Sequence, residues 1–168
     1  MTGHEPRRLF NGDHKRKLLV IVDESPEGEA ALYFAARRAE RTGGKLALVF
    51  VIHPAEMSHW LGVQQAFRDE QHNKARAVFR LRGRKLKSWG FDIVPEEIVR
   101  EGQLAEEIVK VIEEDREIGI LVLGASTDPS GPGPLVSSLA AGAKAGAFPI
   151  PITIVPGNLT LEEIAGLA

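Results

Sequence analysis

The chain has 168 residues, of which 43% are hydrophobic and 26% are charged, which fits one globular domain with its own core. Its formal net charge of −2 argues against a dedicated binder of nucleic acid or of acidic membranes, and no apolar run approaches the roughly 20 residues of a membrane span. The sequence contains no cysteine, which excludes disulfides, thiol nucleophiles and thiolate metal sites and agrees with a cytoplasmic location.

Short apolar runs alternate with helical patterns along the chain. Residues 1–15 are polar and basic, and we expect them to be disordered. The run from Leu18 to Val22 is continuous rather than alternating, which is typical of a strand buried on both faces of a parallel sheet. This predicted strand ends at a carboxylate, Asp23.

A helix is predicted after this strand, with Ser25 as its N-cap and Pro26 in its first position. Its pattern continues through an alanine-rich stretch, and the pair Gly43-Gly44 ends it. The apolar run over Leu46–Ile52 then predicts a second buried strand.

A long helical pattern covers about residues 55–89, although Gly62 and Gly83 argue against one unbroken helix. The third strand is predicted near Phe91–Arg100. It contains Pro95 and several carboxylates, which is typical of a strand at the edge of a sheet.

The remaining elements are a helix from Leu104, a strand over Ile120–Leu123 that ends at Gly124, a helix over Pro134–Ala147 and a strand over Ile152–Val155. The resulting order is βαβαβαβαβ. Such an order predicts an α/β fold with an open five-stranded parallel sheet, helices on both faces and right-handed crossovers.

We expect a single domain over residues 16–157, with an arm or short helix over residues 158–168. The stretch from Thr160 to Glu163 has the spacing of a capping box, in which each side chain bonds the backbone N–H of the other residue. This pattern favours the short helix.

The most informative feature is the pair of strands that end at Asp23 and at Gly124. In a parallel sheet these two ends can form the lips of one crevice, which is where open α/β sheets bind ligands. The loop after Gly124 is rich in turn residues and is of the kind that can place backbone N–H groups against a phosphate.

The sequence resembles the universal stress protein family from about Lys17 to Gly157. Three stretches carry the resemblance: Leu19–Glu27, Glu117–Gly124 and Pro149–Pro156. The resemblance implies a stress-response role and the adenine nucleotide alpha hydrolase-like fold, with strand order 3-2-1-4-5.

The resemblance also implies a homodimer, because family members pair through the edge formed by the last strand. That strand carries no charge and no internal proline here, and an uncovered apolar edge is an aggregation hazard. The expected interface residues are Ile152, Thr153, Ile154 and Val155.

Nucleotide-binding members of the family carry a glycine, two residues, a second glycine, nine residues, and then glycine followed by serine or threonine. On this chain the spacing selects Gly124, Thr127, Ser137 and Ser138, so that two of the three glycines are replaced. The resemblance implies ATP or AMP as the ligand, with Mg as the accompanying ion. It implies adenine near Val22, Asp23 and Val51, and ribose and phosphates against Gly124, Thr127, Ser137 and Ser138.

The loop chemistry argues against tight binding of ATP. Thr127 is β-branched, so a positive φ angle there would be strained. Pro129, Pro132 and Pro134 lack N–H groups, and the loop contains no lysine or arginine. Two functions stay open: an adenine-nucleotide sensor without dedicated catalysis, and a dimeric member of the same family that binds a protein partner and no nucleotide.

No motif specifies a reaction, and we predict that the chain is not an enzyme. It has no G-x-S-x-G elbow, no P-loop and no dinucleotide fingerprint. His53, His59 and His72 have no spacing that suits a helical zinc motif, so no metal site is predicted. The basic stretch over residues 74–87 is interpreted as a solvated helix face and not as a nucleic-acid site.

Overall fold

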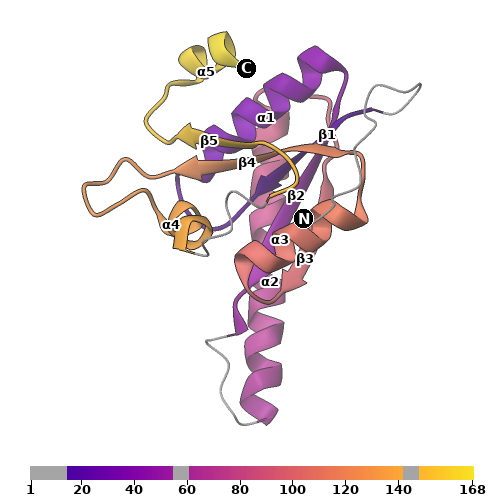
Figure 1. The fold of residues 1–168 in the computed structure, drawn as a ribbon, viewed down its shortest axis with the longest axis vertical. Helices are drawn as coiled ribbons and strands as arrows, with labels where there is room; N and C mark the ends of the chain where they lie inside the picture. Colours follow the sequence, from indigo (N-terminus) through magenta and orange to yellow (C-terminus); the bar gives the residue numbers. More distant parts are fainter. Residues whose placement is uncertain (1–14, 55–60, 142–147) are drawn as a thin grey trace.

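The structure is a computed structural model that describes residues 15–54, 61–141 and 148–168. Five parallel strands form one sheet in the order β3-β2-β1-β4-β5 (Figure 1). This order confirms the one predicted from the sequence. The strands are β1 (Lys17–Ile21), β2 (Lys45–Ile52), β3 (Glu96–Glu101), β4 (Ile118–Ala125) and β5 (Ile152–Pro156).

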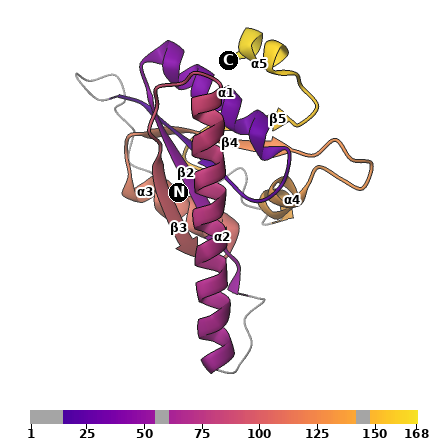
Figure 2. The ribbon, with the colours of Figure 1, turned by 180° about the vertical axis from the view of Figure 1, so that it is seen from behind.

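Helices cover both faces of the sheet, as Figures 1 and 2 show from opposite sides. The helices α1, α2 and α5 pack on one face, and α3 and α4 pack on the other. Their bounds are Gly28–Thr42 for α1, Leu61–Ser88 for α2, Leu104–Glu114 for α3, Pro134–Ala141 for α4 and Leu161–Leu167 for α5. Within the described ranges, no helix combines the length and apolarity of a membrane span.

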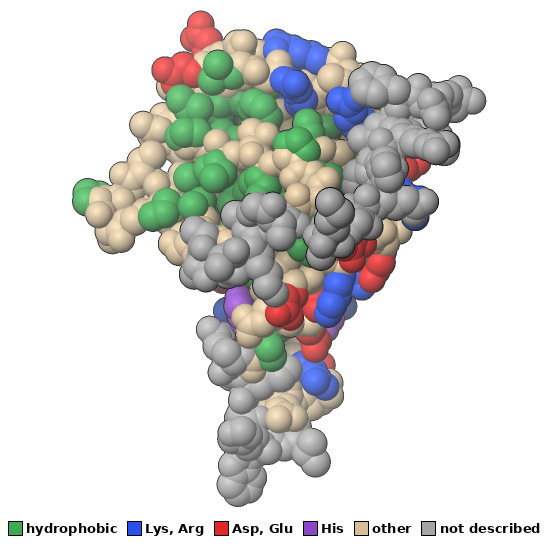
Figure 3. Space-filling view, viewed as in Figure 1, with side chains coloured by type: hydrophobic (Ala, Val, Ile, Leu, Met, Phe, Trp, Pro, Cys, Tyr) green, Lys and Arg blue, Asp and Glu red, His purple; other side chains and the backbone are tan. Residues whose placement is uncertain are grey.

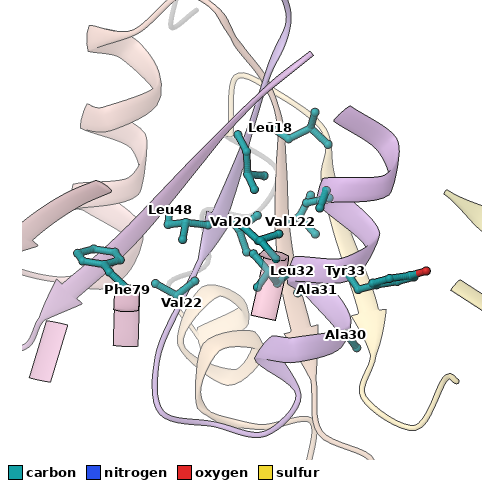
Figure 4. Close-up of a cluster of buried hydrophobic side chains, with 14 of the residues drawn as sticks. Leu18, Val20, Val22, Ala30, Ala31, Leu32, Tyr33, Leu48, Phe79 and Val122 are labelled. Atoms are coloured by element: carbon teal, nitrogen blue, oxygen red, sulfur yellow. The ribbon is translucent and has the colours of Figure 1, made fainter. Parts of the chain in front are cut away.

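Each central strand supplies side chains to two separate cores. In β1 and the residue after it, Leu18, Val20 and Val22 pack under α1 and α2, whereas Leu19 and Ile21 pack under α3 and α4. Successive side chains of a strand point to opposite faces, so a sheet covered on both sides needs a continuous apolar run. Figure 4 shows the first core, with side chains of β1, β2 and β4 meeting those of α1 and α2.

The first helix begins later than the sequence predicted. Its N-cap position is Glu27, which makes no side-chain capping bond, so the prediction of Ser25 as N-cap was wrong. The N–H of Gly28 instead donates to the Ser25 carbonyl at 3.3 Å, which closes a turn ahead of the helix. The helix ends at Gly43 with a φ angle of 66°, as predicted.

The second helix runs without a break from Leu61 to Ser88, across both Gly62 and Gly83. It is long enough to extend well past the sheet at its N-terminal end (Figure 1). The third strand lies at the sheet edge as predicted, but it begins at Glu96 and not near Phe91. Residues 55–60 and 142–147, where the predicted helices extended further, lie outside the described residues.

The chain after β5 forms a short helix that packs on α1. The predicted capping box is present: the Glu163 N–H donates to Thr160 Oγ1 at 3.2 Å, and the Thr160 N–H donates to Glu163 Oε2 at 2.8 Å. Ile164 is fully buried in the same core as α1. Arg41 of α1 donates to the carbonyl of Ala168, which holds the end of the chain against α1.

Candidate functional site

The carboxyl ends of β1 and β4 lie side by side at the centre of the sheet, because these two strands are direct neighbours. After β1 the chain enters α1 on one face, and after β4 it enters α4 on the other face. This is the topological switch point, where open parallel sheets bind their ligands. We call residues 22–27 and 124–138 the switch-point site.

Asp23 lies at this site with half of its carboxylate already engaged. The Ser25 N–H donates to Asp23 Oδ1 at 3.0 Å, and the Ser25 hydroxyl donates to the same oxygen. Among the described residues, no donor is bonded to Oδ2. Asp23 therefore has one oxygen that can accept a hydrogen bond from a ligand.

The two valines predicted to contact adenine are less accessible. Val22 is buried under α1 (Figure 4), and its N–H donates to the Val49 carbonyl at 2.9 Å. Val51, near the end of β2, is half-buried and packs with the core on the α3 and α4 side. Any contact of Val22 with a ligand would therefore involve its backbone.

Arg82 of α2 holds the turn that carries Asp23, and the sequence analysis did not identify this role. Its side chain is only 3% exposed, and Nη2 donates to the carbonyls of Asp23 and Ser25, both at 3.1 Å. Burial lowers the pKa of Arg82, although the nearby carboxylates of Glu29 and Asp23 oppose that shift. Arg82 shares a helix face with buried apolar residues, and that position is the one sequence signal of its burial.

Gly124 allows α1 to approach β4. A Cβ atom at Gly124 would lie 2.2 Å from the Glu27 carbonyl oxygen, a distance that backbone atoms do not tolerate. The glycine that the spacing assigned to a nucleotide motif is thus required here by the packing of a helix start on a strand.

Glu27 fills the space next to this contact, and the sequence analysis did not identify it either. The residue is 8% exposed, and its Oε1 would lie 2.7 Å from a Cβ atom on Gly133. Its own Cβ would lie 2.8 Å from a Cβ atom on Gly157. Glycines far apart in the sequence therefore make room for one glutamate.

The loop between β4 and α4 bonds to itself. The Ser126 N–H donates to the Pro132 carbonyl at 2.8 Å, which closes the neck of the loop. Within it, the Asp128 N–H donates to Ser126 Oγ at 3.2 Å, the Ser130 N–H to Asp128 Oδ1 at 2.8 Å and the Gly131 N–H to the Asp128 carbonyl at 3.1 Å. The bond from Ser130 holds the pKa of Asp128 below its usual value. These four N–H groups are not available to a phosphate.

The predicted phosphate contacts lie on either side of this loop. Thr127 is exposed within it, whereas Ser137 is exposed and Ser138 is half-buried on α4. The Ser137 N–H donates to the Gly133 carbonyl at 3.1 Å, as an ordinary helical bond. Since Pro134 has no N–H, the start of α4 offers only the N–H groups of Leu135 and Val136.

The other candidate residues do not form a site. His72 Nε2 lies 3.2 Å from Glu101 Oε1, His53 is exposed, and His59 lies outside the described residues. No group of side chains in the described ranges could hold a metal ion. Four cations of the basic stretch are exposed, as the sequence predicted: Arg76, Arg80, Arg84 and Lys87. The prediction of a solvated face was wrong for Arg82, which is buried in the same stretch.

Comparison with known proteins gives one family. The model of the universal stress protein family matches residues 15–156. None of the curated proteins compared with the chain matches it.

Solved structures with this fold are also universal stress proteins. UspA from Lactobacillus plantarum is 20% identical with a TM-score of 0.65, over 84% of this chain and 98% of that one. A universal stress protein in complex with cAMP is 16% identical with a TM-score of 0.58, over 86% and 99%. The protein from Archaeoglobus fulgidus in complex with dAMP is 17% identical with a TM-score of 0.59, over 84% and 98%.

Proposed function

The chain belongs to the universal stress protein family, and from this premise we propose that it is a cytoplasmic, homodimeric sensor of adenine nucleotides without dedicated catalysis. Two solved structures with the same fold hold cAMP and dAMP, both of them adenine nucleotides with a single phosphate. In the described part of the chain, no group of three or more His, Cys, Asp or Glu side chains could hold a metal ion.

The observation that carries the proposal is the second carboxylate oxygen of Asp23, which no described residue bonds, at the point where β1 and β4 end as neighbours. A carboxylate oxygen there can accept a hydrogen bond from a ribose hydroxyl or from the amino group of adenine. Arg82 supports this geometry, because it fixes the carbonyls on both sides of the turn.

The residues suit AMP better than ATP. A triphosphate needs cations or several N–H donors, but residues 126–138 include no lysine or arginine. Most N–H groups of the loop are already bonded within it.

Isothermal titration of AMP and ATP into the purified protein tests this proposal. We expect saturable binding of AMP, and we expect Asp23→Asn to weaken it at least tenfold. That factor corresponds to the loss of about 1.5–3 kcal/mol for a hydrogen bond to a charged group. The asparagine keeps the acceptor for Ser25 and removes the second carboxylate oxygen.

Asp92→Asn is the matched control, because Asp92 is exposed on the loop before β3 and lines a cavity near the start of β1 and β2. Equal losses in the two variants would contradict a role for Asp23. Absence of both added and copurified nucleotide would contradict the sensor.

The last strand supports the proposed dimer. Among the strands that the structure describes, none pairs with the outer edge of β5. Ile154 on it is 49% exposed, and Leu161 and Leu167 of the adjoining α5 are exposed as well. Figure 3 shows apolar side chains gathered on the side of the molecule where α4, β5 and α5 lie. Pairing of this edge with a second copy would cover it.

A second function is favoured by the loop itself. The bonds within residues 126–133 and the Glu27 carboxylate near Gly133 both oppose a phosphate. Both features are compatible with a dimeric family member that binds a protein partner and no nucleotide. Titration with adenosine as well as AMP separates the two functions, since this second function predicts no binding of either.

A further inference from the structure

We propose that Glu27 determines which ligands the switch-point site accepts. Its carboxylate occupies the place of an anion beside the start of α4, and it discriminates against each phosphate group that a ligand carries. The identity of the ligand rests on the proposed function above, but the exclusion of anions does not.

The first argument is where the carboxylate lies. Glu27 is more than nine-tenths buried, although glutamate is rarely buried without a partner. Its Oε1 is directed at Gly133, the residue that immediately precedes α4. The N-terminal end of a helix after a parallel strand is where an anionic part of a ligand would bind. The protein's own anion is already there.

The second argument is that this charge is not compensated. Among the described residues, no donor is hydrogen-bonded to the Glu27 carboxylate. Arg82, the buried cation of the site, donates instead to the carbonyls of Asp23 and Ser25. A carboxylate without a cation partner repels a second anion that binds beside it.

The third argument is that glycines make this position possible. At each of three glycines, Gly124, Gly133 and Gly157, an added Cβ atom would collide with an atom of Glu27. Gly133 also has a φ angle of 94°, in the left-handed region that favours glycine. The chain therefore leaves space for Glu27 where these three glycines come together.

Inorganic phosphate is the direct probe, followed through the amide signals of a ¹⁵N-labelled protein. In the unmodified protein we expect no saturable shift at Ser126, Gly133 or Leu135. Glu27→Gln keeps the shape of the side chain and removes its charge. In this variant we expect saturable shifts at these amides, with phosphate bound at least tenfold more tightly than by the unmodified protein. Glu27→Ala removes the charge without adding an amide donor, and the same gain is expected there.

Glu29→Gln is the matched control, because Glu29 lies on the same turn of α1 and is paired with Lys85 at 3.3 Å. We expect it to behave as the unmodified protein. Phosphate binding by the unmodified protein at these amides would overturn the proposal, as would a lack of binding in both folded Glu27 variants. Dispersed amide spectra establish folding of each variant.

Titration with AMP and ATP gives the second readout. We expect the unmodified protein to prefer AMP over ATP, and Glu27→Gln to reduce that preference at least fivefold. If no variant binds any adenine ligand, the proposed sensor fails, while the phosphate experiment still decides the role of Glu27. An unchanged ratio of the two affinities in Glu27→Gln would overturn the proposed discrimination.

Discussion

At the scale of single residues, Arg82 connects the second helix to the switch-point site. Replacing it with methionine keeps the length of the side chain but removes both bonds from Nη2. The carbonyls of Asp23 and Ser25 would then lack these donors. We expect Arg82→Met to lower the free energy of unfolding by about 2–4 kcal/mol, measured by urea denaturation.

Arg80→Met is the control for this change, since Arg80 is exposed on the same helix. Its effect should stay within about 0.5 kcal/mol. Equal effects of the two substitutions would show that the buried bonds of Arg82 contribute nothing of their own.

Lys17 is a second residue whose pKa depends on its surroundings in the folded protein. Its ammonium lies 2.5 Å from Asp115 and 2.7 Å from Glu96, at the opposite end of the sheet from the switch-point site. Burial lowers the pKa of Lys17, but the hydrogen bonds to Asp115 and Glu96 together outweigh this effect and raise it above its ordinary 10.5.

Because the folded state raises this pKa, the stabilisation from Lys17 is complete below 10.5 and is lost as the pH rises through the folded value. As the pH rises above 10.5, we expect the urea midpoint of the unmodified protein to fall more steeply with pH than the midpoint of Lys17→Met. Lys45→Met, which removes a half-exposed ion pair with Glu117, is the control. Parallel curves for Lys17→Met and the unmodified protein would contradict the assignment.

At the scale of elements, glycines have opposite effects in the strand and in the helix. A Cβ atom at Gly124 of β4 meets the backbone of Glu27, so Gly124→Ala forces the start of α1 away from the sheet. A Cβ atom at Gly83 of α2 meets nothing within 4 Å. We expect Gly124→Ala to destabilise by about 1–3 kcal/mol, and Gly83→Ala to stabilise by about 1 kcal/mol.

Thermal or urea unfolding of both alanine variants measures these two effects together. A neutral Gly124→Ala would show that α1 can move away from β4 without cost. A destabilising Gly83→Ala would show that this part of α2 makes contacts that the structure does not include.

The sequence predicted the buried central strands well, but it placed the start of the edge strand β3 and the start of α1 too early. Continuous apolar runs such as Leu18–Val22 indicated burial on both faces, and both faces are covered. Gly62 and Gly83 do not interrupt α2, because a propensity cost of about 1 kcal/mol per glycine is small against the burial of Val78, Phe79 and Leu86.

The candidate site was predicted only in part, for a physical reason. Asp23 and Gly124 could be placed because they end predicted strands, and parallel strands end at one edge. Glu27 and Arg82 could not, because their positions depend on contacts between segments distant in sequence. In local sequence, Glu27 is an ordinary acidic residue near a helix start, and Arg82 is one of several cations.

At the scale of the whole molecule, the state of association is the main prediction. Ile154→Lys places a charge on the exposed side chain of β5, and we expect it to give a monomer, because the lysine would be desolvated in a paired edge. Val155 is unsuitable for this test, since it is buried in the core. Sedimentation equilibrium measures the mass directly.

Val63→Lys is the control for this substitution, because Val63 is similarly exposed but lies on α2. It should leave the dimer intact. A monomeric unmodified protein, or a dimeric Ile154→Lys variant, would contradict pairing through β5.

The length of α2 has a consequence for hydrodynamic experiments. With 28 residues the helix is about 42 Å long, and its N-terminal end extends beyond the sheet (Figure 2). A molecule with such a projection experiences more friction than a sphere of equal mass and leaves a gel-filtration column early. A monomer of this protein would therefore imitate a larger species, so light scattering or sedimentation, and not elution volume, must decide how many chains associate.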